Sequence, residues 1–504
     1  MNSHDNNTTR RTSIKHPVRS RRTLALGVVV AFLAVFPAGA VAVIPGDHPD
    51  PSLLRAGNGW YAAATSGSWL PALPILRSAD LRRWRQVGAV FERPPRWVAG
   101  DFWAPELQRR DGRVLAYYSA RSHGGRRCVA VASAERLRGP YRDHGPLVCT
   151  RVGAIDPFPA RDEYGGDWLL WKEDGNSVGE PTPIVAAPLA PGGAGLAGPP
   201  RELLRADAPW ERGLIEAPAV LRFAGTFYLV YSAGSCCGPR CTYVIGIARA
   251  ASLLGPWEKH PGPLPTGNAG LRCLGHASVA RGPGGTLLLA HHAYVRGDPA
   301  NRRLLITQLR FGADGWPEPS GEVPVVGAAT PSVERFLGNG LGQGWQWPLG
   351  ARPTAALRRG RLVLGPGAVG RQARTDSFVA ETDVAWRRGG ARPGLAVMAS
   401  RSNAVGVELR DRRAVAWRRL DGRLTSAVSR RITPRRGVGG RGVALRIVSG
   451  PTVRVEVRPR RRWISIGGEH EPPRWTSGPR VALRVSGEPK ARAAFEKLVI
   501  RPVP

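Results

Sequence analysis

Long amphipathic helical periodicity is absent from this chain of 504 residues. A mainly helical fold is therefore excluded, because packed helices need apolar residues every three to four positions. No recognition helix for a nucleic-acid groove is visible, and no histidine pair with the spacing of metal ligands accompanies the six cysteines. These absences predict an all-β protein that binds no nucleic acid.

Acidic residues are also scarce, with 38 Asp and Glu against 73 Lys and Arg. The imbalance is largest over residues 331–504, where 35 Lys and Arg stand against 12 Asp and Glu. Nearly all of the basic residues are arginines, which suggests a composition bias as much as a function. A solvated surface is the common explanation. Contact with an acidic wall polymer through the basic C-terminal domain is the functional alternative.

Residues 1–42 are predicted to be a secretory leader that is not part of the fold. The pair Arg21-Arg22 and other basic residues precede an apolar run from Leu24 to Phe36, and small residues at 38–42 offer cleavage sites. The arginine pair loosely resembles a twin-arginine export signal. An uncleaved anchor is the alternative, but the apolar run is short for a membrane span. We expect a secreted, extracellular protein with no membrane contact after cleavage.

One short pattern recurs five times in the first three hundred residues. In each copy a small or acidic residue, usually next to proline, leads into an apolar strand, a Gly- or Asp-containing turn and a second apolar-aromatic strand. Repeats of this length, each with room for several short strands, are typical of β-propeller blades. We therefore predict a five-bladed β-propeller over residues 43–325, with copies that begin at Asp50, Ala104, Asp156, Glu216 and His276.

All six cysteines lie in the propeller half, between Cys128 and Cys273. This usage suits an oxidising compartment and favours disulfides, with a metal site as the alternative. Spacing alone leaves the connectivity open. Cys128 and Cys149 are expected to pair because both lie on the outer half of the second blade.

A second domain is predicted after the repeats stop near Pro319. Residues 326–344 form a Gly-rich segment that is expected to be a linker. Over residues 345–504 short period-2 strands recur with turn signals between them, which is typical of a β-sandwich. No histidines, cysteines or paired carboxylates gather in this domain, so we expect it to be structural or sugar-binding.

Three carboxylates begin blades that lie far apart in the sequence: Asp50, Asp156 and Glu216. Corresponding positions of a propeller converge on its axis, so these side chains are predicted to share one pocket. Hydrolysis of a glycosidic bond needs one protonated carboxyl group for the leaving oxygen and one ionised carboxylate that activates water or attacks directly. A third carboxylate beside the acid can raise its pKa and orient it. The alternative is that the Asp-Pro pairs only cap turns.

Five segments of the chain resemble glycoside hydrolase family 43 in their order and spacing. They are His48-Pro-Asp-Pro-Ser52, Phe102-Trp-Ala-Pro-Glu106, Ile155-Asp-Pro157, Glu216-Ala-Pro218 and Gly275-His-Ala-Ser278. The resemblance implies a five-bladed propeller that cleaves α-L-arabinofuranosides, β-xylosides and related linkages with inversion. Many relatives have Glu-Gly-Pro where this chain has Glu-Ala-Pro. Residues 345–504 resemble the concanavalin-like β-sandwich that follows the propeller in some members.

The resemblance also implies roles for single residues. Asp50 matches the general base, Glu216 the general acid, and Asp156 the residue that raises the pKa of that acid and orients it. Trp103 matches an aromatic side chain that lines the sugar site. His276 matches a histidine near the axis that in many members ligates a structural ion or its water shell. No cofactor is required by this chemistry, and a structural calcium or other ion at the axis is an expectation.

Lys172 is a further candidate for the substrate site. It lies in the segment Trp171-Lys-Glu-Asp-Gly175 of the third blade. An inner strand at this place is expected to bring Lys172 into the pocket as a substrate-binding residue. A solvated β-turn is the alternative.

These observations predict a secreted hydrolase that cleaves α-L-arabinofuranosyl or β-D-xylosyl linkages of plant-wall polysaccharides or oligosaccharides by an inverting mechanism. A catalytically silent carbohydrate-binding propeller is one alternative, and the presence of all three acids argues against it. A wall-adhesion protein is the other. It predicts salt-sensitive binding to acidic polymers without release of sugar.

Overall fold

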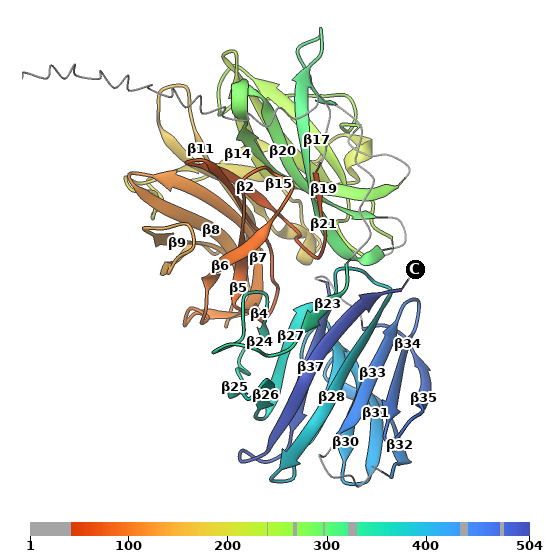
Figure 1. The fold of residues 1–504 in the computed structure, drawn as a ribbon. Coiled ribbons are helices and arrows are strands. Elements are labelled where there is room, and N and C mark those ends of the chain that lie inside the picture. Colours follow the sequence, from red (N-terminus) through yellow and green to blue (C-terminus); the bar gives the residue numbers. More distant parts are fainter. Residues whose placement is uncertain are drawn as a thin grey trace, which may run out of the picture. The chain divides into compact units, whose positions relative to one another are not determined.

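The computed structural model describes residues 42–238, 240–265, 270–295, 298–320, 330–433, 442–473 and 478–503. All of them belong to one compact unit, Pro37–Pro504. Strands dominate this part of the chain (Figure 1), and its helical segments are three short 3-10 turns: η1 (Gly175–Ser177), η2 (Pro209–Glu211) and η3 (Pro283–Gly285). The all-β prediction is confirmed. No helix among the described residues is long and apolar enough to cross a membrane.

Four antiparallel sheets of four strands each form the first four blades, and each blade comes from one continuous stretch of the chain. The first blade contains β2 (Ser52–Ala56), β3 (Gly59–Ala63), β5 (Ala72–Ser78) and β6 (Arg85–Phe91). The second contains β7 (Val98–Arg110), β8 (Arg113–Ser122), β9 (Arg127–Ala134) and β10 (Arg142–Val148). The third contains β11 (Ala154–Arg161), β12 (Asp167–Glu173), β13 (Ile184–Pro188) and β14 (Arg201–Leu204). The fourth contains β15 (Ile215–Phe223), β16 (Thr226–Ala233), β17 (Val244–Ala250) and β18 (Glu258–Lys259).

The fifth blade is completed by a strand from the beginning of the described chain. Its strands are β19 (Leu271–Arg281), β20 (Leu287–Val295) and β21 (Asp298–Phe311), with β1 (Ala42–Ile44) and β22 (Pro317–Ser320) both paired to β21. Ala42 was expected to end the leader, but it pairs opposite Ile306 in this sheet. Strand edges need partners for their backbone N–H and C=O groups, and β1 supplies them to β21. The fold therefore begins no later than Ala42.

The five blades close into a ring. The inner strands β2, β7, β11, β15 and β19 contact one another in that order, and β19 also contacts β2. Middle strands such as β16 read as continuous apolar runs because both of their faces are buried against neighbouring blades. The five-bladed propeller predicted from the repeats is confirmed.

Each blade has a backbone irregularity at the same point. The φ angles of Asp50, Ala104, Asp156, Ala217 and His276 are 53°, 46°, 60°, 55° and 48°. In the last four blades the register between the inner strand and its neighbour shifts at this point. Bulges of this kind re-aim side chains, and a left-handed non-glycine residue persists only where its surroundings hold it. The strain therefore gathers at the ends of the inner strands, where the candidate acids lie.

The second half of the chain forms two further sheets. One contains, in spatial order, β25 (Ala355–Arg358), β26 (Arg361–Leu364), β37 (Arg492–Pro502), β28 (Phe378–Arg388), β33 (Val443–Ser449), β34 (Val453–Arg458) and β35 (Ile464–His470), with β23 (Ser332–Glu334) also paired to β37. The other contains β27 (Gly367–Gln372), β36 (Arg480–Ser486), β29 (Arg392–Met398), β30 (Ala404–Arg410), β31 (Arg413–Leu420) and β32 (Arg423–Arg431). Both sheets contribute to one apolar core, which makes this half a β-sandwich.

The structure differs from the sequence prediction at two places in this half. Ser332–Glu334 lies inside the predicted linker, yet it is a strand of the sandwich. The edge strand β32 lacks the period-2 pattern that predicted the sandwich. In β32 nearly every side chain is exposed. An edge strand of this kind lacks the alternation of apolar and polar residues by which strands are recognised.

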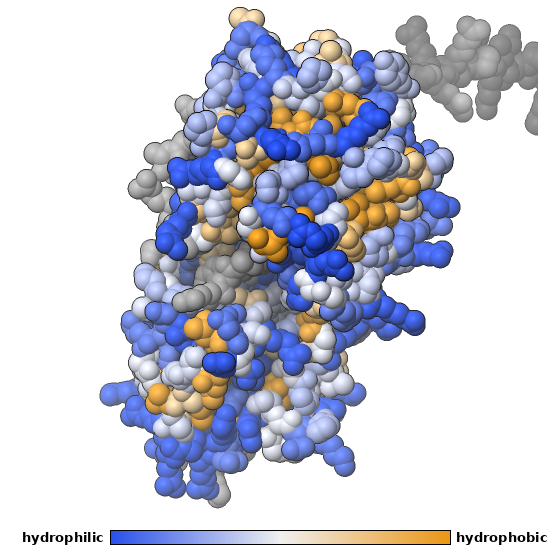
Figure 2. Space-filling model, turned by 180° about the vertical axis from the view of Figure 1, so that it is seen from behind, coloured by the Kyte–Doolittle hydropathy of each residue, from blue (hydrophilic) through white to orange (hydrophobic). Residues whose placement is uncertain are grey.

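Contacts inside the compact unit join the propeller to the sandwich. The short strand β4 (Trp69–Leu70) of the first blade pairs with β24 (Trp347–Pro348). The indole N–H of Trp69 donates to the carbonyl of Ala399, 2.9 Å away. The face shown in Figure 2 is mainly hydrophilic with separate apolar patches, as expected for a chain rich in arginine.

Candidate active site

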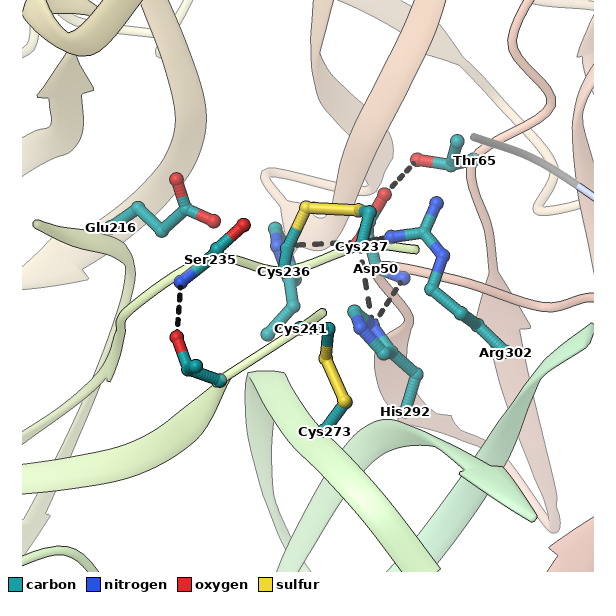
Figure 3. The surroundings of a disulfide bond; sticks show 12 residues. Asp50, Thr65, Glu216, Ser235, Cys236, Cys237, Cys241, Cys273, His292 and Arg302 are labelled. Atoms are coloured by element: carbon teal, nitrogen blue, oxygen red, sulfur yellow. Dashed lines mark hydrogen bonds and ion pairs between the residues drawn. A yellow bond between two sulfur atoms is a disulfide. The ribbon is translucent and has the colours of Figure 1, made fainter. Parts of the chain in front are cut away.

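Asp50 lies just before β2 and is held by groups from the first and fifth blades (Figure 3). The hydroxyl of Thr65 donates to Oδ2 at 2.6 Å, and the guanidinium of Arg302 lies 3.0 Å from Oδ1. The backbone N–H of Asp50 donates to Nδ1 of His292 at 3.1 Å. Both oxygens of Asp50 are therefore fixed in direction by side chains that are distant in sequence.

The charge of Asp50 is maintained by these neighbours. Burial by itself would raise its pKa, but Arg302, the two histidines His276 and His292, and the Thr65 hydrogen bond together hold the pKa of Asp50 well below its ordinary value. Asp50 is consequently ionised at neutral pH. An ionised and oriented carboxylate is what a general base requires.

Asp156 connects the third blade to the fourth. Its Oδ2 accepts the backbone N–H of Ala217 at 3.1 Å, and its own N–H donates to the hydroxyl of Ser119 at 3.0 Å. Burial, and next the charge of Glu216, raise the pKa of Asp156 well above its ordinary value. Asp156 thus fixes the peptide that follows Glu216, which is the geometry of an orienting residue.

Glu216 is bound by a buried lysine. Nζ of Lys172 lies 2.7 Å from Oε2 of Glu216 and 3.3 Å from Oδ1 of Asp174. Burial lowers the pKa of Lys172, but the charges of Glu216, Asp156 and Asp174 outweigh it and the pKa is raised. Lys172 therefore stays a cation among three carboxyl groups. Its side chain is 1% exposed, so it does not lie in a solvated turn.

A series of polar contacts leads from Glu216 to Trp103. Asp174, which binds Lys172 through Oδ1, accepts from Nη1 of Arg127 through Oδ2 at 3.2 Å. The guanidinium carbon of Arg127 lies 4.3 Å from the centre of the Trp103 ring. Asp101 also lies within 3.5 Å of this guanidinium. Arg127 therefore fixes the aromatic ring and the partner of Lys172 at once.

His276 faces the carboxylates from the fifth blade. Its Nδ1 lies 3.7 Å from Asp50 and 4.0 Å from Asp156. Burial lowers the pKa of His276 although Asp50 and Glu216 oppose the shift. Within the described residues no group of three or more His, Cys, Asp or Glu side chains could hold a metal ion. The donors around His276 thus do not fit a protein-ligated ion, and an ion at this place stays a prediction.

The structure corrects the alignment of the five blade starts. As predicted, Asp50, Asp156 and His276 occupy equivalent positions at the starts of their blades, and the structure shows that all three have a positive φ. In the fourth blade the equivalent residue is Ala217, so Glu216 lies one position earlier. Trp103 likewise precedes Ala104, the irregular residue of the second blade. Glu216 and Trp103 therefore occupy equivalent positions in the fourth and second blades.

Glu106 is a buried carboxyl group that binds two serines of neighbouring blades. It lies two residues after Ala104, and its Oε1 accepts the hydroxyls of Ser278 at 3.1 Å and Ser52 at 3.3 Å. Burial raises the pKa of Glu106 to about 8, against the effect of both serines. This carboxyl group is mainly protonated at neutral pH, so it adds little negative charge to the three acids nearby.

Several functional residues were not found from the sequence: Thr65, Arg127, His292 and Arg302. Arg302 is one of 73 basic residues, so composition hides it. Thr65 and His292 belong to no motif, because each is recognised only by its contacts with Asp50 in the folded structure. A signal existed for Arg127 alone, since it directly precedes a cysteine of a predicted disulfide.

All six cysteines are paired. The predicted bond between Cys128 and Cys149 is confirmed. The others join Cys236 to its neighbour Cys237 and Cys241 to Cys273, and Figure 3 shows these bonds together with Asp50 and Glu216. No free cysteine is left for a metal.

The arrangement suits general acid–base hydrolysis. It offers one ionised, oriented carboxylate at Asp50 and a second carboxyl group, Glu216, on another blade. Between them Asp156 and Lys172 balance charge and fix direction. Two carboxyl groups that come from different blades can act from opposite sides of a bond that is placed between them.

Comparison with known proteins supports this interpretation. The family model described as "Glycosyl hydrolases family 43" matches residues 41–317. An extracellular endo-α-(1→5)-L-arabinanase 1 of Bacillus subtilis is 28% identical over 287 residues, which cover 53% of this chain and 86% of that protein. An extracellular exo-α-(1→5)-L-arabinofuranosidase of Cellvibrio japonicus is 28% identical over 304 residues, covering 54% and 86%. A β-xylosidase of Bacillus subtilis is 30% identical over 270 residues, covering 49% and 48%.

Solved structures match both halves of the chain. A Bacteroides ovatus protein from a xyloglucan utilisation locus superposes with a TM-score of 0.74 at 19% identity, covering 92% of this chain and all of that one (100%). A xylan β-1,4-xylosidase of Bacillus halodurans superposes with a TM-score of 0.73 at 20% identity, covering 91% and 99%. At this identity the matches show the fold alone.

Proposed function

Because this chain belongs to glycosyl hydrolase family 43, we propose that it is a secreted glycosidase that cleaves α-L-arabinofuranosyl or β-D-xylosyl linkages of plant-wall polysaccharides with inversion. Its relatives include proteins named arabinanase, arabinofuranosidase and xylosidase. The observation that carries the proposal is the pairing of Asp50 with Arg302 opposite the pairing of Glu216 with Lys172.

The proposed mechanism assigns one task to each group. Asp50, ionised and oriented by Thr65 and Arg302, takes a proton from the attacking water. Glu216 donates a proton to the leaving oxygen, and Asp156 holds the adjacent peptide so that this carboxyl group points into the pocket. Water attack on the face opposite the leaving group inverts the anomeric centre.

Substitution of the two acids tests the assignment. We expect Asp50→Asn and Glu216→Gln each to lower kcat by about 10²–10⁴-fold, because both keep the volume and lose the charge or the proton. Activity is measured on nitrophenyl α-L-arabinofuranoside, nitrophenyl β-D-xyloside and linear arabinan, and circular dichroism checks the fold. Near-wild-type turnover in either variant would overturn the roles.

Stereochemistry and export are tested separately. Proton NMR of the first-formed sugar should show the inverted anomer, and the retained anomer would exclude direct attack by water. Expression of the full chain in a bacterial host with both export routes should place the active enzyme outside the cell. An enzyme that stays in the cytoplasm would contradict the proposed leader.

A role for the basic sandwich in binding an acidic wall polymer is a further part of this proposal. Its support is the charge of residues 331–504, with 35 Lys and Arg against 12 Asp and Glu. Sedimentation with polygalacturonate at low and high salt tests it. Absence of binding at low salt would leave the sandwich a structural domain.

A further inference from the structure

The loop between β16 and β17 carries three of the six cysteines. Cys236 and Cys237 are bonded to each other, and Cys241 is bonded to Cys273 of β19. Figure 3 shows Asp50, Glu216 and Arg302 among the residues that surround these bonds. The loop therefore lies next to the acids Asp50 and Glu216.

Packing ties this loop to the catalytic base. Cys236 and Cys241 contact a cluster of Tyr243, Cys273 and Tyr294. The ring of Tyr243 stacks on His292 with centroids 5.7 Å apart, and His292 accepts the backbone N–H of Asp50. Burial and then the charges of Glu216, Asp156 and Asp50 raise the pKa of Tyr243.

Anchoring of the loop is already provided by other contacts. The bond between Cys241 and Cys273 crosses 32 residues and joins the loop to the fifth blade. Ser235 donates its N–H to the Thr242 hydroxyl, and Thr242 donates its N–H to the carbonyl of Ser235. These contacts close the loop at its base without Cys236 or Cys237.

A bond between neighbouring cysteines contributes little to this anchoring. Disulfides stabilise mainly by closing long loops in the unfolded chain, and the stabilisation falls as the loop shortens. With a sequence separation of 1, the bond between Cys236 and Cys237 closes almost none. What it does change is the surface, because two thiols, which are weak hydrogen-bond donors, become one rigid and polarizable apolar patch.

We propose that the Cys236–Cys237 disulfide is a contact surface for the sugar unit bound at the catalytic acids, and that its sulfur atoms pack against the C–H face of that pentosyl ring. Both cysteines are half-buried, so the bond has an accessible side. The charged groups on the other blades bind hydroxyls, whereas this surface takes the apolar face of the ring. The inference rests on the proposed function and adds a specificity-determining element to the same site.

The double variant Cys236→Ser/Cys237→Ser tests the contact. Peptide mapping without reduction first establishes the bond in the wild-type enzyme, and finding free thiols there would overturn the proposal. We expect the KM for the preferred nitrophenyl pentoside, and the inhibition constant of the free product sugar, to rise about three- to tenfold, as for the loss of a few tens of Å² of apolar contact. The kcat should change less than about twofold.

The matched control is Cys128→Ser/Cys149→Ser, which removes the bond of the second blade. Its unfolding temperature should fall by about 5 °C or more while KM stays within about twofold, because it opens a loop of 21 residues. The Cys236→Ser/Cys237→Ser enzyme should show the opposite pattern, with weaker sugar binding and an unfolding temperature within about 2 °C of wild type.

Two outcomes would reject the sugar contact. Unchanged KM and product inhibition in the Cys236→Ser/Cys237→Ser enzyme would show that the sulfurs touch no sugar. A fall in kcat together with a lower unfolding temperature would show that the bond only shapes the loop. Failure of the proposed function is distinguishable, since the wild-type enzyme would then turn over none of the pentosides.

Discussion

Lys172 illustrates what one residue contributes at the centre of the propeller. Three carboxyl groups, those of Glu216, Asp156 and Asp174, act on its ammonium group. Without a cation these acids would repel one another in a buried pocket, and their protons would be retained to higher pH. Lys172 therefore determines how much negative charge the site can hold.

Replacing Lys172 by methionine should weaken catalysis without unfolding the enzyme. We expect kcat/KM to fall about 10- to 100-fold, the loss that corresponds to one hydrogen bond between charged groups. Lys172 lowers the pKa of Asp156, so its removal should also move the basic limb of the kcat/KM profile to higher pH. Lys497→Met, which removes an exposed partner of Asp383, is the control and should stay within about twofold. A wild-type pH profile in Lys172→Met would contradict this account.

Asp156→Asn tests the charge of the orienting residue. One negative charge is removed beside Glu216, while the ion pair of Lys172 with Glu216 remains. A carboxyl group loses its proton more easily once a neighbouring negative charge is gone. The basic limb of the rate profile of Asp156→Asn should therefore move toward lower pH. The acidic limb, which reports Asp50, should move much less. If only KM changes, Asp156 binds sugar instead of controlling the proton.

At the scale of the structural elements, the bulge of each inner strand positions the site. None of the five irregular residues is glycine, and two of them are the alanines Ala104 and Ala217. A side chain beyond Cα is strained at positive φ, and the cost is borne where the function needs it. The bulge allows Glu216 and the backbone N–H of Ala217 to contact Lys172 and Asp156 on the neighbouring blade.

Ala217→Gly should relieve this strain and preserve activity. The left-handed conformation costs alanine about 1–2 kcal/mol, and the greater freedom of unfolded glycine offsets about half of the gain. We expect the free energy of unfolding to rise by up to about 1 kcal/mol. The matched control, Ala219→Gly on the same strand, has a regular backbone and a buried side chain, so it should lose about 1 kcal/mol. Equal destabilisation by both would mean that Ala217 is not strained. Chemical denaturation provides the measurement.

At the scale of the whole molecule, Asp47 links the two halves of the described chain. It accepts the backbone N–H of Arg302 at 3.1 Å and that of Gly478 at 2.5 Å. Burial raises its pKa, although Arg302 and Arg480 oppose the shift. Since Arg302 is also the partner of Asp50, the sandwich and the catalytic base share one support.

Asp47→Ala should therefore affect stability and catalysis together. Two buried backbone N–H groups lose their acceptor, at a cost of about 1–3 kcal/mol each. Displacement of Arg302 should lower kcat/KM and move the acidic limb to higher pH, because Arg302 holds the pKa of Asp50 low. The half-buried Asp383→Ala, in the sandwich, removes only a side-chain ion pair with Lys497, so it is the control and should change stability by less than about 1 kcal/mol. Wild-type kinetics in Asp47→Ala would show that the sandwich does not support the base.

The sequence by itself determined the features that depend on local pattern. Period-2 strands and repeated turns predicted the propeller and the sandwich, because alternation is a property of consecutive residues. The repeated blade starts predicted that Asp50 and Asp156 occupy equivalent positions. Because blade starts converge on the propeller axis, they also predicted that Glu216 lies near both of them. Local pattern was insufficient for β32, whose exposed residues show no alternation.

Only the tertiary structure decided which groups balance the buried charges. Arg302 lies 252 residues from Asp50, and Lys172 lies 44 residues from Glu216. No local pattern connects such pairs, since a charge is indifferent to the sequence position of its partner and depends on distance and burial. The same reason explains why Glu216 lies one position before the irregular residue of its blade. The bulge at Ala217 is stabilised by Asp156, a residue of another blade.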